Sequence, residues 1–472
     1  MNPISIKKLS KLKPKPGDVI YLKQGTYKDL QVSINFNGTL KSPITILPSA
    51  GTIITLTGKS NLKINGSYTT VVGLKFHKCT SNKTIKIAGH HNRVNNIELS
   101  NHLKDCEKMV QITGQYSTVD HSYFHDFNTL GCIVCVDRPN DDPNYAMIDS
   151  CVFENRKPVQ GENNGQECIR VGDSKYSLSK SYSVVSNNLF KQVDGEIEII
   201  SVKSGKNTIK HNTIYESEGC ITLRHGNESQ VICNEILQNG KPNTGGIRIT
   251  GSDHYIFNNH ISEINGNGTM RVGISLNCGV NNSPLNRYHQ VDNCVIKKNL
   301  IVNCSNAFAI GVKKNEANLK PTDVFIVDNT IISELSTPLF SDDKSCIGSD
   351  LYFERNKFYG HKLGRHGQNH EILNPDDCKL DLEGKCYGCD ESIGLNDNDY
   401  ELEPCRECEF EDSESDSESD SPISDTEYEP DSEKSETDSE SDSDSDCEEC
   451  IKSTDLLEHL LVLIHEHLEE AN

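Results

Sequence analysis

The chain has 472 residues, of which 34% are hydrophobic and none is tryptophan, and its formal net charge is −23 at pH 7. It has no uninterrupted apolar run of roughly 18 residues, so we expect no membrane span. Residues 1–370 hold 42 Lys and Arg against 33 Asp and Glu, whereas residues 371–472 hold 5 against 37. A basic body thus precedes a strongly acidic tail, and a basic body favours anionic partners such as nucleic acid or acidic polysaccharide.

The amino-terminal segment, MNPISIKKLSKLKPKPGDVIYL, lacks the apolar core of a secretory signal peptide. We therefore expect a soluble protein made inside a cell, which could be released by lysis or packaged in a particle; its site of action stays open. The 19 cysteines then indicate reduced thiols or metal ligands rather than a disulfide framework.

A short repeat, in which Asn is followed by any residue and then Ile or Phe, runs through the middle of the chain. Its first four copies are 24, 22 and 25 residues apart, and short β-branched runs lie around them. Such repeats predict an all-β fold, a right-handed parallel β-helix, over residues 1–370. A compositional bias toward Asn and Ile is the alternative, but a bias does not produce a repeating register. The copies begin at Asn188, Asn212, Asn234, Asn259, Asn299, Asn329 and Asn356.

The segment DGEIEIISVKSG, residues 194–205, places two glutamates on alternate positions of an expected strand. Glu196 and Glu198 would then point the same way, and Ca²⁺ is the natural cation for such a carboxylate pair. Lys203 reaches this face only if the backbone bends near Ser201. Arg224 follows Lys203 by 21 residues, about one coil, so the two cations would be neighbours in successive coils.

Asn164 precedes Glu196 by 32 residues, one coil plus an inserted loop, and would join the same patch. This set suits proton abstraction beside a carboxylate, with a metal on the substrate carboxylate, Lys203 as the base and Arg224 assisting the departing oxygen. The predicted reaction is β-elimination on a uronic-acid polysaccharide. Two alternatives are hydrolysis by the paired glutamates and a non-catalytic β-helix that binds glycans as an attachment protein.

The motifs GEIEIISVKSGKN and GCITLRHGN resemble the central signature of polysaccharide lyase family six, which includes chondroitinase B and alginate lyases. LKPKPGDVIYLKQGTYKD and LTGKSNLKINGSYTTVVGLKF resemble that family's opening coils, and the resemblance covers roughly residues 12–360. It implies a calcium-dependent lyase on a β-helix, acting on alginate or on a chondroitin- or dermatan-type glycan.

The resemblance also implies a role for each residue of the patch. The calcium ligands would be Asn164, Glu196 and Glu198, the base Lys203, the acid Arg224, and the substrate contacts Arg170 and His225. Selectivity among uronate polymers would depend on loops and on groove cations, for which Arg248 and Arg271 are candidates. We therefore expect an acidic polysaccharide rather than nucleic acid as the partner.

Three further segments follow the body. Residues 371–408 contain two Cys-x-x-Cys pairs whose spacing suits a zinc ribbon, with free cysteines in a linker as the alternative. Residues 409–450 form an acidic, serine-rich tract that we expect to be disordered, and residues 451–472 predict a short amphipathic helix. The acidic tract would bind a basic partner, aid solubility, or lie in the basic groove as a polyanion mimic. The zinc candidates are Cys386, Cys389, Cys405 and Cys408.

Overall fold

The computed structural model describes residues 2–342 and 351–364, and the backbone of residues 379–380 and 386–387. The predicted zinc site, of which only the backbone of Cys386 is included, lies outside this part of the chain. The acidic tract and the carboxyl-terminal helix lie outside it as well. No helix among the described residues has the length and apolar character to cross a membrane.

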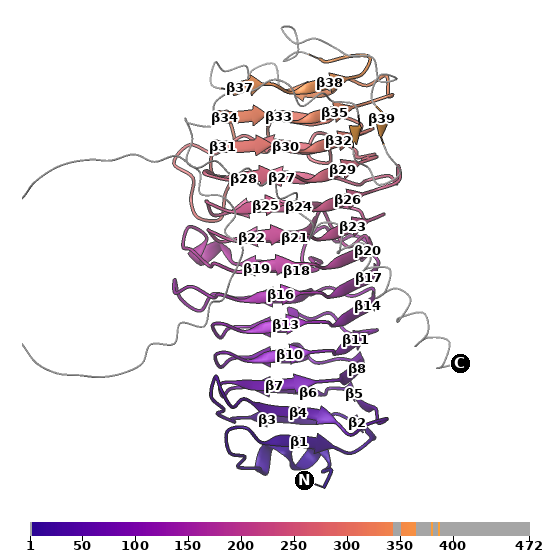
Figure 1. The fold of residues 1–472 in the computed structure, drawn as a ribbon, viewed down its shortest axis with the longest axis vertical. Coiled ribbons are helices and arrows are strands. Elements are labelled where there is room, and N and C mark those ends of the chain that lie inside the picture. Colours follow the sequence, from indigo (N-terminus) through magenta and orange to yellow (C-terminus); the bar gives the residue numbers. More distant parts are fainter. Residues whose placement is uncertain (1, 343–350, 365–378, 381–385, 388–472) are drawn as a thin grey trace, which may run out of the picture. The chain divides into compact units, whose positions relative to one another are not determined.

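The chain winds through three parallel sheets, and each turn of the coil contributes one strand to each sheet (Figure 1). Sheet A consists of β1 (Val19–Leu22), β4 (Ile44–Pro48), β7 (Thr69–Val72), β10 (Arg93–Asn95), β13 (Thr118–Asp120), β16 (Met147–Asp149), β19 (Val184–Ser186), β22 (Thr208–Lys210), β25 (Gln230–Ile232), β28 (Tyr255–Phe257), β31 (Asp292–Lys297), β34 (Thr322–Val327) and β37 (Leu351–Glu354). Sheet B consists of β2 (Gly25–Lys28), β5 (Ile54–Gly58), β8 (Leu74–Cys79), β11 (Glu98–Ser100), β14 (Tyr123–Phe127), β17 (Val152–Arg156), β20 (Leu189–Val193), β23 (Thr213–Tyr215), β26 (Glu235–Leu237), β29 (His260–Ser262), β32 (Leu300–Val302), β35 (Thr330–Ile332) and β38 (Lys357–Tyr359).

Sheet C, which carries the candidate site, is the third sheet of the coil. It consists of β3 (Gln31–Ile34), β6 (Asn61–Ile64), β9 (Ile85–Ile87), β12 (Lys108–Ile112), β15 (Cys132–Val136), β18 (Ile169–Gly172), β21 (Glu198–Lys203), β24 (Cys220–His225), β27 (Ile247–Ile249), β30 (Ile274–Asn277), β33 (Phe308–Val312) and β36 (Phe340–Asp342). Two 3-10 turns, η1 (Ile6–Lys11) and η2 (Ser174–Tyr176), and the antiparallel pair β39 (Lys379–Leu380) and β40 (Cys386–Tyr387) complete the described elements. The predicted right-handed parallel β-helix is confirmed.

The core is formed by every second side chain of each short strand, because alternate side chains face the interior of the coil. In sheet A, Ile209, Val231 and Ile256 are each fully buried and occupy matching positions in successive coils. Their β-branched side chains favour extended backbone and stack on one another at the strand spacing of about 4.8 Å. Ile6 and Leu9 of η1 join the same core at the amino-terminal end.

The repeated asparagines form a buried ladder at the corner between sheets A and B. The Oδ1 of each accepts the backbone N–H and the side-chain amide of the preceding one, as Asn259 does from Asn234 at 3.0 and 2.9 Å. The ladder runs without a break from Asn188 to Asn356. Ser122 and Cys151 hold the equivalent places in the two preceding coils. The predicted repeat is therefore a real structural register.

Candidate active site

Two irregularities in sheet C shape the centre of the molecule. β21 pairs with β24, but Ile199 is an extra residue between Glu198 and Ile200. Ile199 and Ile200 are both buried in the core, so the alternation reverses and Lys203 emerges on the same side as Glu198. The predicted bend is therefore present, two residues before Ser201.

A second irregularity lies on β24. Val202 of β21 is opposite Leu223, but Lys203 is opposite His225, so Arg224 is the extra residue. Lys203 and Arg224 are thus neighbours in successive coils, as their 21-residue separation predicts. Bulges commonly re-aim side chains beside functional sites.

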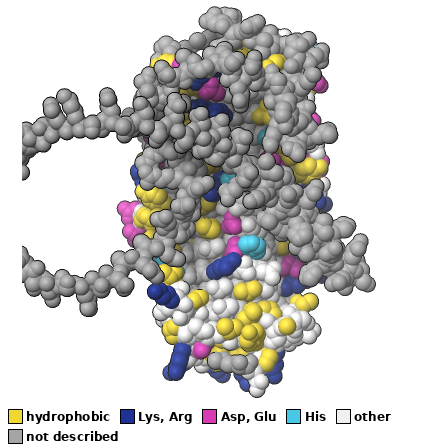
Figure 2. All heavy atoms as spheres, in the orientation of Figure 1, with side chains coloured by type: hydrophobic (Ala, Val, Ile, Leu, Met, Phe, Trp, Pro, Cys, Tyr) yellow, Lys and Arg dark blue, Asp and Glu magenta, His cyan; other side chains and the backbone are white. Residues whose placement is uncertain are grey.

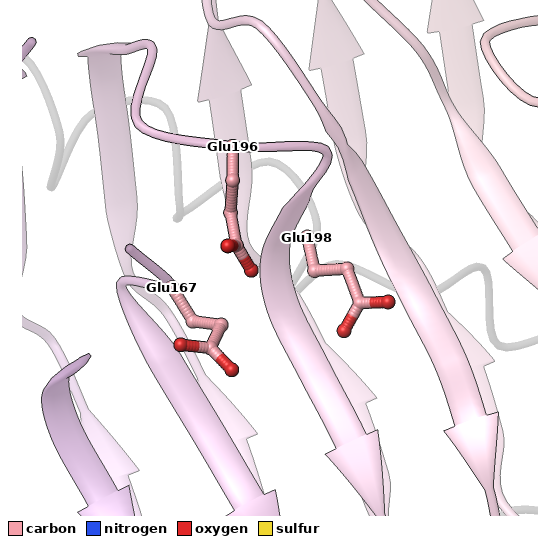
Figure 3. A group of neighbouring side chains, drawn as sticks. All are labelled: Glu167, Glu196 and Glu198. Atoms are coloured by element: carbon pink, nitrogen blue, oxygen red, sulfur yellow. The ribbon is translucent and has the colours of Figure 1, made fainter. Parts of the chain in front are cut away.

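Three carboxylates meet beside the first residues of β18 and β21. One oxygen from each of Glu167, Glu196 and Glu198 lies within 4.8 Å of the others, and all three side chains are buried. Figure 3 shows Glu198 at the start of β21, with Glu167 on the connection that leads into β18 and Glu196 on the connection that leads into β21. The expectation that Glu196 lies in the same strand as Glu198 is wrong, because β21 begins only at Glu198. The turn before β21 nevertheless brings Glu196 into the group.

The three carboxylates differ in how their charge is balanced. Glu198 accepts a hydrogen bond from Ser201 and lies 3.4 Å from Arg248 Nη1 and 3.6 Å from Arg224 Nε. Burial opposes its ionisation, but the positive charges of Arg248 and Lys203 outweigh burial and hold the pKa of Glu198 below its usual value. Glu198 is therefore an anion at neutral pH.

Glu196 is the poorly compensated member. Its Oε2 accepts only the backbone N–H of Gln166, at 3.2 Å, among the contacts of the described residues. Burial and the negative charges of Glu167 and Glu198 raise the pKa of Glu196 to about 8. A carboxylate in this state would be neutralised by a proton or by a bound cation.

Two cations with different surroundings stand beside the carboxylates. Lys203 Nζ lies 3.3 Å from Glu167 Oε1 and 3.9 Å from Glu198 Oε2. Arg224 Nε lies 3.6 Å from Glu198 Oε1, and burial lowers the pKa of the Arg224 guanidinium. A lysine and an arginine thus flank one group of acids.

His225 is neutral and holds Arg224. Burial, with the positive charges of Arg224 and Lys203, lowers the pKa of His225 to about 2. Its Nδ1 lies 3.3 Å from Arg224 Nη1, and its Nε2 lies 3.4 Å from Ser174 Oγ. Because a neutral imidazole has one acceptor nitrogen, Nδ1 accepts from the arginine and Nε2–H donates to the serine.

A loop from farther along the chain closes over these cations. The ring of Tyr288 lies over the Arg224 guanidinium, 4.1 Å from its carbon, and the Tyr288 hydroxyl accepts a 3.1 Å hydrogen bond from Arg248. The carbonyl of Leu285 accepts a hydrogen bond from Ser177, 108 residues earlier. The loop therefore spans several coils and fixes two arginines at once.

The remaining predicted residues fall in different places. Arg170 lies on β18, 3.8 Å from Glu167, and belongs to the cluster. Asn164 is exposed on the loop before Gln166. Arg271 contacts Glu218 at 3.9 Å and the backbone oxygen of Asn243. The structure thus brings six predicted residues to one face of sheet C: Arg170, Glu196, Glu198, Lys203, Arg224 and His225.

Sequence reasoning missed Glu167 and Tyr288. Glu167 precedes Ile169 by two residues, just as Glu198 precedes Ile200, and these two isoleucines are opposite each other. The equal offset in successive coils is a signal that could have identified Glu167. Tyr288 has no comparable signal, because a long insertion delivers it.

The cluster fits a hard divalent cation. The Oε2 of Glu167 is buried and has no hydrogen-bond partner in the described structure, and Glu196 lacks an ion-pair partner there. Buried acceptors without partners are rare in folded proteins, so these oxygens are suited to metal ligation. Ca²⁺ prefers carboxylate oxygens of this kind.

Comparison with known proteins places this parallel β-helix in a family. The family model described as chondroitinase B matches residues 6–348. An alginate lyase of polysaccharide lyase family six is 31% identical with a TM-score of 0.74, over 82% of this chain and 54% of its own. The chain belongs to polysaccharide lyase family six, and it spans about half the length of that alginate lyase.

Two other solved structures are similar over most of their length. A mannuronic acid-specific family six lyase from human gut microbiota is 27% identical, with a TM-score of 0.68, over 76% of this chain and 84% of its own. A family six alginate lyase in complex with a trisaccharide is 27% identical, with a TM-score of 0.71, over 81% and 87%. Comparison with curated proteins gave no match.

Proposed function

We propose that this chain cleaves a uronic-acid polysaccharide, of the alginate or chondroitin/dermatan type, by calcium-dependent β-elimination. The observation that carries the proposal is the meeting of a carboxylate group, Lys203 and Arg224 on adjacent strands. The alginate lyase relatives support a uronate polymer as the substrate class.

The chain's own residues account for each proton and electron pair. Lys203 Nζ, in its neutral form, accepts the proton from the carbon beside the uronate carboxylate. The electrons form a double bond to the next carbon, and the bond from that carbon to the glycosidic oxygen breaks. Arg224 donates a hydrogen bond to this oxygen and relays the proton it needs. His225 and Tyr288 hold the guanidinium in place for that step.

Glu196 and Glu198 would hold calcium, with Glu167 beside them and Asn164 on the adjoining loop. When bound, the ion supplies positive charge for the substrate carboxylate and for the enolate-like state that follows proton loss. Its charge would also offset the burial and the mutual repulsion that raise the pKa of Glu196.

The test follows the ultraviolet absorbance of the unsaturated uronate, which elimination produces and hydrolysis or binding does not. Lys203→Ala should lower the rate on the responsive polymer by about 10²- to 10⁴-fold, because it removes the base. Lys210→Ala, in the same coil on sheet A, is the matched control and should keep full activity. Chelation should abolish the signal and calcium should restore it. Activity that survives both Lys203→Ala and chelation would contradict the assignment.

A further inference from the structure

The basic charge of the body is concentrated at its amino-terminal end. Residues 1–97 contain 15 Lys and Arg against 2 Asp and no Glu, whereas residues 98–370 contain 27 against 31. Figure 2 shows Lys and Arg side chains around the lowest coils, which contain the amino terminus in Figure 1. The first coils are therefore strongly cationic, although they lie below the catalytic cluster.

Two of these lysines lie in line with the candidate active site. Lys63 on β6 is opposite Lys86 on β9, and Lys86 is opposite Gln111 on β12. The same row of sheet C continues through Cys135 to Arg170. We call Lys63 and Lys86 the lysine pair. At about 4.8 Å per strand, Lys63 lies four steps, or about 19 Å, from Arg170.

The lysine pair faces outward and has no acidic partner. Leu62, Ile64 and Ile85 beside them are buried, so alternation turns both lysines away from the core. Within the described residues, no ion pair involves either lysine. Other cations of the same coils differ: Lys75, Lys83 and Arg93 each contact an acid.

A cavity fills the interval between the lysine pair and the cluster. It has a volume of about 260 Å³, and Gln111, Arg138 and Arg170 are part of its lining. Its lining also includes Lys108 and the carboxylates of Asp137 and Asp173. Three cations and two acids line one cavity, so both donors and acceptors are at hand for the hydroxyl and carboxylate groups of a sugar.

We propose that sheet C binds the uronate polymer beyond the reacting sugar, in the direction of the amino terminus. One sugar occupies the cavity, and the next carboxylates lie against Lys86 and Lys63. The strand spacing is close to the advance per sugar in an extended chain, so successive carboxylates can meet successive strands. This inference rests on the proposed function and adds the direction in which the substrate extends.

The test reverses both charges in the full-length protein with Lys63→Glu and Lys86→Glu. The matched control is Lys28→Glu with Lys78→Glu, two exposed lysines on sheet B with the same change in net charge. The readout is kcat/KM on a long uronate polymer divided by kcat/KM on a trisaccharide. At low salt this ratio should fall about 10-fold for the lysine-pair variant through a higher KM, and salt should diminish the effect.

Equal ratios in the variant and the parent, or an equal fall in the sheet B control, would overturn the inference. Binding of the polymer by Lys203→Ala protein, with and without the lysine-pair substitutions, separates this inference from the proposed function. If the parent protein binds the polymer through the lysine pair but does not cleave it, the lyase proposal is contradicted and the role of the lysine pair is supported. If the parent protein cleaves the polymer and charge reversal leaves binding unchanged, the lyase proposal is supported and the role of the lysine pair is contradicted.

Discussion

Single residues in this site act through their surroundings more than through their type. Glu196 and Glu198 are two positions apart, yet the pKa of one is raised to about 8 and that of the other is lowered. The difference arises because the charges of Arg248 and Lys203 act on Glu198, whereas Glu196 accepts only a backbone N–H among the described residues. The cluster of three carboxylates thereby contains both a stable anion, Glu198, and a carboxylate, Glu196, whose charge would be stabilised by a bound cation.

Tyr288 is a positioning residue whose two contacts can be separated. Tyr288→Leu removes the ring from Arg224 and the hydroxyl from Arg248, whereas Tyr288→Phe keeps the ring. We expect Tyr288→Leu to lower kcat about 10-fold with a smaller change in KM, because the stacked guanidinium loses its orientation. Tyr288→Phe should stay within about 3-fold of the parent by the same argument. Equal losses in steady-state assays of both variants would assign the effect to the hydroxyl.

At the scale of elements, the coil register explains why so many residues meet. One strand per coil in sheet C brings residues from β18, β21 and β24 within about 10 Å of one another. The extra residue Ile199 then selects which side chains of β21 face outward. The site is thus a property of three adjacent strands and two bulges.

The asparagine ladder should be a main determinant of stability. Asn259 accepts from Asn234 and donates to Val231 and Asn299, all in buried surroundings. Asn259→Ala leaves several buried groups unpaired and should lower the free energy of unfolding by about 3 kcal/mol. Asn356→Ala, at the half-buried end of the ladder, should cost about 1 kcal/mol. Urea unfolding of both variants checks this, and equal costs would contradict a cooperative ladder.

Sheet B carries an ionic cluster, from which we predict a pH dependence of the free energy of unfolding. Glu98 Oε1 lies 2.8 Å from Lys75 and 3.3 Å from His125, and His125 also contacts Asp126. Burial opposes ionisation, but hydrogen bonds from His125 and Lys75 lower the pKa of Glu98 from 4.5 to about 2. Burial also opposes protonation of His125, but Glu98 and Asp126 raise its pKa above 6.5.

The two shifts set opposite limits. The contribution of Glu98 is present above pH 4.5 and is lost as the pH falls toward 2, and that of His125 is present below 6.5 and is lost at higher pH. Glu98→Gln should therefore cost about 1 to 2 kcal/mol near pH 6 and less near pH 3, since solvent screens part of the pairing. Unfolding experiments at both pH values check this. Glu354 forms an exposed ion pair with Arg355, so Glu354→Gln is the control and should change the free energy of unfolding little.

At the scale of the β-helix, the basic charge of the first coils and the carboxylate cluster are separated along the coil axis. The first coils are cationic, whereas the cluster lies beyond them on the same sheet. Under the proposed function, such an arrangement would draw an anionic polymer to one end of the sheet and lead it toward Lys203 and Arg224, and added salt should weaken this attraction.

The local pattern in the sequence was sufficient to predict the coil, because each repeat carries its own strands, turns and asparagine. The spacing from Lys203 to Arg224 equals one coil, so their meeting also followed from counting residues. Counting could not identify Ile199 as the bulge, since Ile199 and Ile200 are both apolar and either could be the extra residue. Glu167 was overlooked, because the length of an inserted loop does not reveal where the next strand begins. Tyr288 and the lysine row depend on contacts between coils, and such contacts exist only once the chain is wound and stacked.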